Sequence, residues 1–383
     1  MAHIKKLSNG RYKAIVEMGK SPSTGKRKRR TKTFDRKKDA QTWVGEKITE
    51  RETGTDVDPS KVTVAEFLDR WLNNHKKPKV EATTYDRYKN KINAHLKPGL
   101  GGIPIQDLEP YHVESYFAKK RVSGRKDNKE GGLSENTLKK HYVILNNAMK
   151  RALKLKLIKY NPVQAVESPQ PEDYEAPVMR KEEYHKLLNE IKDDALMFAF
   201  VMTDLMTGMR RSEILGLEWS EVDLEEGVIE VKKRLVTVEG GTLHENKTKN
   251  DSSKRKIKIS EKLISILKKY KNEQNKMKLK ATKYDKSKNF VFCRPDGKHY
   301  APKTFNNKLD KYLEQAGLTQ EYTIHTLRHT FATLNLEHGV PAKIVQEMLG
   351  HSTISTTLDI YSHVDLDMQQ EAVGKLEKAI NIE

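Results

Sequence analysis

Apolar residues recur along most of this chain at spacings of three and four, the pattern of helices that bury one face. The longest such pattern spans residues 134–155 and places one stripe on a single face: Leu138, Tyr142, Leu145, Met149 and Ala152. The same spacing predicts helices at 84–96, 110–121, 180–191, 195–207, 261–276, 302–316, 327–338, 342–349 and 366–380. The chain should therefore be mainly helical.

Alternating polar and apolar residues predict β-strands in two regions. Residues 11–17 and 30–34 alternate on either side of a turn-like segment at 19–25, and a helix should follow from about Arg36. Two further strands are predicted at 227–236 and 254–259. Because the helices dominate and the sheets are small, the predicted fold class is α+β. The helix after Arg36 should turn four residues inward: Ala40, Trp43, Val44 and Ile48.

Two segments that contain proline and serine, 56–60 and 168–173, interrupt these patterns and predict linkers. After the first linker, Thr63 and Glu66 have the spacing of a capping box, so a helix should begin there. A chain of 383 residues suits two or three domains. We therefore predict domains at 1–58, 63–168 and 176–383.

The formal net charge is +19, and so basic a chain predicts a polyanionic partner, with nucleic acid as the first candidate. The alternative is a lysine-rich surface that serves only solubility. Nine Lys or Arg and a single acidic residue, Asp35, lie between Lys26 and Lys38. We predict DNA contacts from two groups, one on the small sheet and one on the 134–155 helix: Lys26, Arg27, Lys28, Arg29 and Arg30, and Lys139, Lys140, Lys150, Arg151 and Lys154.

Other classes of protein fit the sequence poorly. The single cysteine, Cys293, rules out an intrachain disulfide and a cysteine-rich zinc site, and we expect a buried, inert thiol. His325 and His329 have a zinc-like spacing, but Arg328 lies between them without a glutamate base, so no metal is expected. No signal peptide is recognisable at the N-terminus, and the longest apolar run, 195–202, is too short to span a bilayer. We expect a cytoplasmic protein with no membrane partner.

Several polar residues could form a phosphate site with its own nucleophile. A helix would put His325 and Arg328 on one face, while Arg210 begins a helix with Glu213 one turn later. His351 ends an LGH sequence, and a tyrosine follows ten residues later. A tyrosine with its free pKa of about 10 attacks a phosphate only beside a base or a cationic clamp. Taken singly, however, each group has a common structural explanation, such as a surface ion pair or a hydrogen-bonded histidine.

In combination, the sequences TGMRRSEILGLEW, HTLRHT and LGH resemble the tyrosine recombinase (phage integrase) family across the C-terminal half. The resemblance implies that Arg210 and Arg328 clamp the scissile phosphate, and that Glu213 supports them. Lys247 matches the family's hairpin lysine, a general acid, although Lys249 is a close alternative. His325 matches the first histidine of the family's second motif, and His351 matches the histidine or tryptophan that hydrogen-bonds the phosphate. Tyr361 matches the nucleophile. No cofactor is implied.

The resemblance extends to the N-terminal sections. Residues 1–58 resemble a three-stranded sheet plus helix that binds arm-type DNA sites, and 63–168 a helical, SAM-like core-binding domain. It implies an integrase of a phage or mobile element in a bacterial host, associated with the nucleoid. It also implies a homotetramer on double-stranded DNA, helped by accessory bending or directionality proteins. The helix at 366–380 would pack onto a neighbouring subunit, or serve as an ordinary core helix.

Two alternatives to an integrase remain. One is a catalytically inactive DNA-binding regulator derived from a recombinase. The other is a type IB topoisomerase, which shares the tyrosine chemistry. The intact Arg210, Arg328 and Tyr361 argue against the first, and the basic arm-like segment and LGH against the second.

Overall fold

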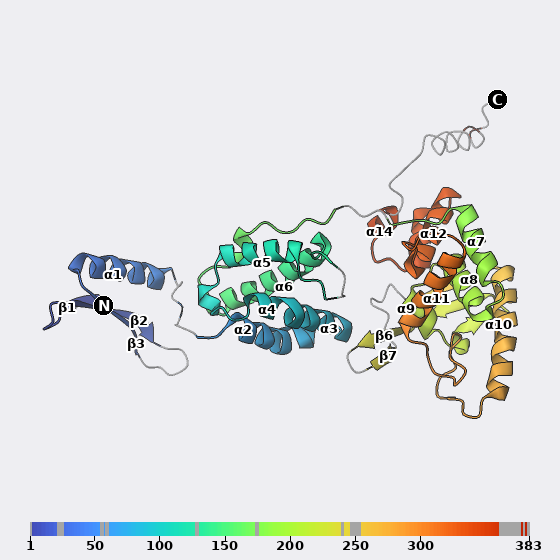
Figure 1. The fold of residues 1–383 in the computed structure, drawn as a ribbon, viewed down its shortest axis with the longest axis horizontal. Helices are drawn as coiled ribbons and strands as arrows, with labels where there is room; N and C mark the ends of the chain where they lie inside the picture. The colour runs from blue at the N-terminus through green and yellow to red at the C-terminus, as the bar shows by residue number, and fades with distance from the viewer. Residues whose placement is uncertain are drawn as a thin grey trace. The chain divides into compact units, whose positions relative to one another are not determined.

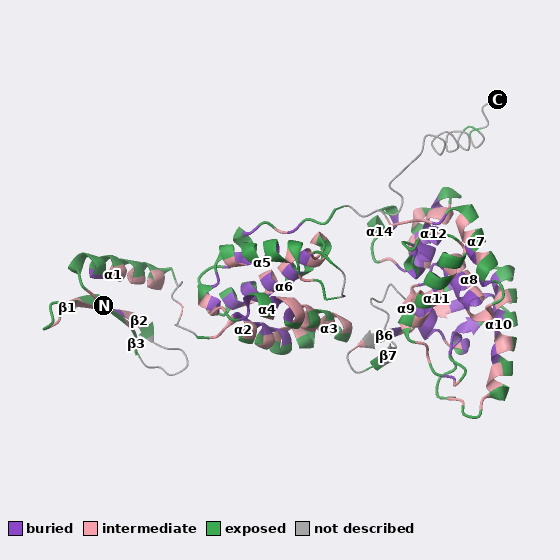
Figure 2. Cartoon of the chain, in the orientation of Figure 1, coloured by how far each residue is buried: buried purple, intermediate pink, exposed green. Residues whose placement is uncertain are grey.

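The computed structural model describes residues 2–20, 27–53, 57, 61–126, 130–172, 176–238, 241–245, 254–359, 377 and 380 (Figure 1). Contacts divide the chain into two compact units, Met1–Asp173 and Tyr174–Glu383. Each unit contains its own core of buried apolar side chains, which are purple in Figure 2. The mixture of many helices with small antiparallel sheets confirms the predicted α+β class.

A three-stranded antiparallel sheet opens the first unit, in the order β1 (Ala2–Lys6), β2 (Tyr12–Lys20) and β3 (Arg27–Phe34). Helix α1 (Lys37–Glu52) packs on this sheet. The fully buried residues here are small, namely Ala14, Val16 and Ala40, while the three larger residues predicted to point inward are only half-buried. The prediction of a buried helix face was therefore only partly right: Trp43, Val44 and Ile48 keep substantial exposure.

The rest of the first unit is helical, as predicted. Thr63 and Glu66 form the capping box: the Thr63 backbone N–H donates to the Glu66 carboxylate (3.0 Å) and the Glu66 N–H to Thr63 Oγ1 (3.3 Å). The predicted stripe on α6 is buried at four positions, whereas Tyr142 is half-buried. The elements are α2 (Val64–Arg70), η1 (Trp71–Lys76), η2 (Lys77–Lys79), α3 (Ala82–Lys91), η3 (Ile92–Leu96), α4 (Lys97–Leu100), η4 (Ile105–Asp107), α5 (Pro110–Val122), α6 (Glu135–Lys154) and η5 (Pro162–Ala165).

A histidine pair lies in this helical core and should make its stability depend on pH. His141 is fully buried, its Nδ1 lies 2.9 Å from Tyr116 Oη, and its ring centroid lies 4.9 Å from that of His95. Burial, with His95 and nearby lysines, lowers the pKa of His141 to about 3. The unfolded chain therefore takes up this proton first as pH falls below 6.5, at a cost of up to about 1.4 kcal/mol per pH unit.

We predict that urea unfolding of the helical part will show stability falling between pH 6.5 and 4.5. A His141→Leu variant, which has no such proton to take up, should show a shallower decline over the same range. Parallel curves for the two proteins would contradict this assignment.

The second unit carries the remaining elements. They are α7 (Lys181–Ile191), α8 (Ala195–Thr207), α9 (Arg211–Gly216), η6 (Trp219–Glu221), β4 (Val222–Asp223), β5 (Val228–Val231), β6 (Arg234–Val238), β7 (Gly241–Glu245), β8 (Arg255–Lys258), α10 (Glu261–Lys280), α11 (Pro302–Gln315), α12 (Ile324–Glu337), α13 (Ala342–Leu349) and α14 (Ser355–Leu358). None of the helices within the described ranges is long and apolar enough to cross a bilayer.

The strands of this unit differ from the sequence prediction. The single strand expected at 227–236 is wrong: β5 belongs to the sheet β4-β5-β8, while β6 pairs with β7 in a separate hairpin. The break falls at Lys232 and Lys233, and the Lys233 ammonium is held by Glu218 (3.1 Å) and Glu221 (3.3 Å) outside the sheet. The strand predicted at 254–259 is confirmed as β8, which pairs with β5.

Two of the predicted helices, at 327–338 and 366–380, differ from the structure or lie largely outside the described residues. Helix α12 begins at Ile324 rather than 327, because Thr323 accepts the Thr326 backbone N–H and so caps the helix one turn earlier. The helix predicted at 366–380 lies outside the described residues, apart from 377 and 380.

Cys293 is buried, and this burial raises the pKa of its thiol, in keeping with the inert role expected for it.

Candidate active site

The turn between α8 and α9 places the first predicted site residue. Gly208 ends α8 in the left-handed conformation (φ 60°), and a Cβ there would lie 2.4 Å from Phe331 Cδ1. Only glycine fits both the backbone conformation and the contact with α12. Arg210 follows as the N-cap of α9, so the turn directs it toward the end of α13.

Arg210 is fixed by two acceptors. Its Nη1 donates to Glu213 Oε1 (2.8 Å) and its Nη2 to the Gly350 carbonyl (2.9 Å). Burial raises the pKa of Glu213, but Arg255 and Arg210 outweigh it and hold that pKa below its ordinary value. Glu213 is therefore an ionised, buried carboxylate that orients the guanidinium. The guanidinium keeps N–H donors for another anion.

Arg328, on α12, is almost completely buried at 4% exposure. Its Nη1 donates to the Gly208 carbonyl (2.5 Å) and its Nη2 to the Leu349 carbonyl (2.9 Å). Burial, with Arg210 nearby, lowers its pKa to about 9, so it remains a cation at neutral pH. The carbonyl ends of α8 and α13 thus compensate part of the cost of burying this charge.

A third arginine, Arg255 on β8, joins the network and was not singled out from the sequence. Its Nη2 donates to Glu213 Oε2 (2.9 Å) and its Nε to the Met348 carbonyl (2.5 Å). A signal for it did exist: in the alternating strand it shares the inward face with the buried Ile257. An arginine on the buried face of a strand indicates an internal ion pair.

Together the three arginines cap three consecutive carbonyls at the end of α13. Arg255 binds that of Met348, Arg328 that of Leu349 and Arg210 that of Gly350. Helix C-termini leave such carbonyls without helical partners and carry partial negative charge. The LGH sequence therefore supplies backbone acceptors to the site as well as its histidine.

His351 follows directly after these carbonyls. Its Nδ1 lies 3.0 Å from Oγ1 of the buried Thr357, which fixes the orientation of the ring. Burial and the nearby Arg328 and Arg210 lower its pKa to about 3, so the imidazole is neutral at physiological pH. A neutral ring held in this way can still donate one hydrogen bond.

An open hollow of about 470 Å³ lies beside these groups. His325 lines it from the first turn of α12, with its ring 4.7 Å from that of His329 in an edge-to-face arrangement. Arg211, beside it, donates to Asn306 Oδ1 (2.7 Å). The lining residues are Met209, Arg210, Arg211, Ser212, Asn306, Thr323, Ile324, His325 and Arg328. The predicted Lys247, its alternative Lys249 and Tyr361 lie outside the described residues.

Asp204 is a second group missed by the sequence interpretation. It is fully buried on α8, and no hydrogen bond to either carboxyl oxygen is found among the described residues. Burial raises its pKa well above the ordinary value, more than the attraction of Arg328 lowers it. Burial therefore favours the protonated form of Asp204, whereas Arg255 and Arg210 favour the ionised form of Glu213. The described part of the chain holds no cluster of three metal-ligating side chains.

The basic residues predicted to contact DNA lie on two surfaces of the first unit. On β3, Arg27 and Arg29 face Glu17 (3.8 and 3.1 Å), while Arg30 donates to the Val57 carbonyl (3.0 Å). Lys28 lies between them, half-buried on the same strand, and Lys26 lies outside the described residues.

On α6, the predicted lysines join basic residues of α3. Lys139 and Lys140 line a hollow of about 490 Å³ with Arg87 and Lys91. Burial lowers the pKa of Lys91, and Lys140 and Arg87 add to the effect, so these cations crowd one another. Lys150, Arg151 and Lys154 lie in the last turns of α6, two of them close enough to His75 to help lower its pKa.

Comparison with known proteins agrees with this geometry. Residues 177–368 match the model of the phage integrase family, and residues 63–120 match a phage integrase N-terminal SAM-like domain. A tyrosine recombinase XerC-like protein of Caldanaerobacter subterraneus subsp. tengcongensis is 29% identical, covering 97% of each chain. The ICEBs1 integrase of Bacillus subtilis is 25% identical over 98% of this chain and 99% of its own.

Solved structures share the fold. The integrase of the transposon Tn1549, in complex with a circular intermediate DNA, covers 82% of this chain and 99% of its own, with a TM-score of 0.69 at 22% identity. A lambda integrase tetramer bound to a Holliday junction covers 94% of both chains, with a TM-score of 0.59 at 18% identity. Because the family model matches half of the chain, the chain belongs to the phage integrase family of tyrosine-type site-specific recombinases.

Proposed function

We propose that this chain integrates and excises a phage or mobile element by cutting and rejoining DNA through Tyr361. The observation that carries the proposal is the convergence of Arg210 and Arg328 beside one open hollow. Each guanidinium is held by protein acceptors on one side and keeps further N–H donors. Two such cations suit the two nonbridging oxygens of one phosphodiester.

In the proposed reaction the Tyr361 phenol attacks the scissile phosphorus and forms a 3′-phosphotyrosine, while the bond to the 5′ oxygen breaks. Negative charge grows on the nonbridging oxygens, and fixed guanidinium groups stabilise that charge without having to reorganise. Lys247 would protonate the departing 5′ oxygen, with Lys249 as the alternative donor. His325 and the neutral His351 would donate hydrogen bonds to the phosphate.

The same site would reseal DNA without an external energy source. The phosphotyrosine ester retains the energy of the broken phosphodiester, so a 5′ hydroxyl from a second strand can attack it directly. Exchange of the first pair of strands leaves a Holliday junction, and repeating the exchange on the other pair of strands resolves it. A clamp on one phosphate thus supports cutting, exchange and rejoining.

For DNA binding, we propose the cationic surfaces of the first unit. The crowded cations of α3 and α6 repel one another in the free protein, and a DNA backbone would relieve that repulsion. The predicted contacts at Lys139, Lys140, Lys150, Arg151 and Lys154 lie along α6. This part would bind core-type attachment sites in the host nucleoid.

For the sheet at the N-terminus, we propose binding to arm-type sites, with accessory bending or directionality proteins shaping the DNA. Its strand β3 carries the basic run from Arg27 to Arg30. Deleting residues 1–58 should spare cleavage of core sites but impair integration. Undiminished integration by the truncated protein would refute the arm-site assignment.

A homotetramer is proposed as the active assembly, as in the lambda integrase complex with a Holliday junction.

A nicked DNA that carries the attachment site tests the proposed function, because it traps the covalent protein–DNA intermediate. The reaction contains excess EDTA and no ATP. The short strand between site and nick diffuses away after cleavage, so a covalent protein–DNA complex should accumulate. A topoisomerase would also relax plasmids that lack the site, whereas a recombinase should join two site-bearing DNAs. An inactive regulator would bind the DNA and form no adduct.

A further inference from the structure

Arg255 lies at the junction of three parts of the site, although it does not line the hollow beside Arg210. It is on β8, it donates to Glu213 of α9, and it donates to the last turn of α13 through Met348. Its side chain is only 7% exposed. Of the groups that hold Glu213 ionised, Arg255 contributes the largest favourable effect, ahead of Arg210.

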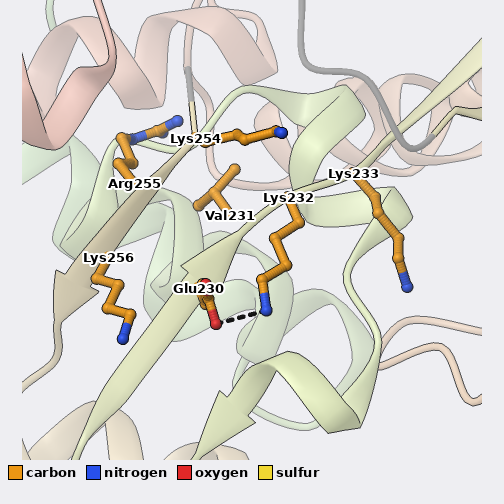
Figure 3. A pocket seen from close by; sticks show the side chains of 7 residues that line it. All are labelled: Glu230, Val231, Lys232, Lys233, Lys254, Arg255 and Lys256. Carbon is orange, nitrogen blue, oxygen red and sulfur yellow. Dashed lines mark ion pairs between the residues drawn. The ribbon is translucent and has the colours of Figure 1, made fainter. Parts of the chain in front are cut away.

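The neighbouring residues of the same strand show that Arg255 is not simply one more surface cation. Lys254 and Lys256 are exposed and line a hollow with Lys232 and Lys233 (Figure 3). Arg255 also contributes to the lining of this hollow, but its side chain is far less exposed than those of the two lysines beside it. Figure 3 shows Arg255 extending to the opposite side of the strand from Lys256. The strand alternates, so the lysines face solvent and Arg255 faces the interior.

Contacts around Gly350 show how tightly the arginine is placed. A Cβ at Gly350 would lie 3.0 Å from Arg255 Nη1, and Gly350 itself is in the left-handed conformation (φ 67°). The Gly350 carbonyl is also the acceptor of Arg210. Displacing Arg255 would therefore disturb both supports of Arg210, the Glu213 carboxylate and the loop that follows α13.

We infer that Arg255 is a positioning residue for recombination, which fixes Glu213 and the carbonyls of α13 so that Arg210 and Arg328 meet the scissile phosphate. This inference rests on the proposed function. Arg255 uses two different donors for acceptors on two elements. A lysine in its place has one ammonium at the end of a flexible chain and cannot reproduce this fixed fork.

The experiment compares Arg255→Gln and Arg255→Lys with wild type in single-turnover cleavage of the nicked site DNA, with protein saturating. We expect the rate to fall about 100-fold for Arg255→Gln and about 10-fold for Arg255→Lys, in the range for misplaced phosphate-stabilising donors. DNA affinity should change less than about threefold, because one internal cation contributes little to a many-phosphate interface. Lys258→Gln, which removes an exposed cation from the same strand, is the matched control and should cleave at the wild-type rate.

A second substrate separates positioning from loss of fold. Replacing one nonbridging oxygen of the scissile phosphate by methyl gives a neutral methylphosphonate, which needs less cationic stabilisation. If Arg255 acts through the clamp, the difference between wild type and the Arg255 variants should shrink at least about tenfold on this DNA. An equal loss on both substrates would mean a general structural role and would overturn the inference.

The remaining outcomes are also decisive. If Arg255→Gln fails to fold, the folded Arg255→Lys variant carries the test, because it keeps the charge opposite Glu213. Wild-type cleavage by either folded variant would overturn the inference and leave the proposed function intact. If wild type itself forms no adduct, the proposed function fails instead.

Discussion

Replacing Arg328 by alanine should reduce cleavage of the attachment site by about 1000-fold or more while leaving most of the DNA affinity. The guanidinium is the most deeply buried cation of the clamp, and it donates to Gly208 and Leu349. Removing a fixed donor from a developing oxyanion costs about 3–4 kcal/mol, and here a positive charge is lost as well. Binding is spread over many phosphates, so one contact contributes little to it.

Single-turnover cleavage and a DNA-binding titration measure the two quantities separately. The alanine variant also leaves the two carbonyls without a partner, which costs stability of about 1–3 kcal/mol for each. Arg328→Lys keeps a charge but not the fork, and it should show the same catalytic defect with a smaller loss of stability. Arg294→Ala removes an exposed arginine paired with Asp296 (3.2 Å) and serves as the control. Cleavage near the wild-type rate by a folded Arg328→Ala protein would exclude the clamp role.

The helical framework could be predicted from the sequence because its signals are local. The stripe on α6 and the Thr63 capping box both depend on residues within a few turns of one another. The strand break at Lys232 and Lys233 depends instead on Glu218 and Glu221, earlier in the chain, whose pairing with Lys233 appears only in the folded unit. Periodicity alone therefore joined two strands that lie in different sheets.

The candidate site also contains some residues that local spacing could predict and others that it could not. Arg210 with Glu213, and His325 with Arg328, could be paired by helical spacing, and the structure brings these residues to one region. Arg255 lies 42 residues beyond Glu213, and its other partner is a backbone carbonyl of α13. Backbone acceptors have no signature in residue type, so the three consecutive carbonyls could not be read from the letters MLG. Asp204 is visible in the sequence as an acid within an apolar helix, but its burial near Arg328 depends on the packing of α8 against α12.

Tyr361→Phe should eliminate the covalent protein–DNA complex altogether, because the substitution removes the one oxygen that would bond to phosphorus. The substitution removes only the hydroxyl and keeps the ring, so folding and DNA affinity should stay within about twofold of wild type. The arginine clamp remains in place, but an orienting clamp without a nucleophile leaves only slow hydrolysis by water. The expected result is a clean loss of adduct with intact binding.

The measurement is denaturing electrophoresis of the nicked-site reaction, followed by protease digestion of the wild-type adduct to identify the peptide attached to the 3′ phosphate. That peptide should contain Tyr361. Tyr160→Phe removes the hydroxyl of an exposed tyrosine of the other unit and should form the adduct normally. An adduct that persists in Tyr361→Phe would place the nucleophile at another residue. The arginine clamp could then still bind the phosphate, since Arg210 and Arg328 donate to acceptors on α9 and at the ends of α8 and α13.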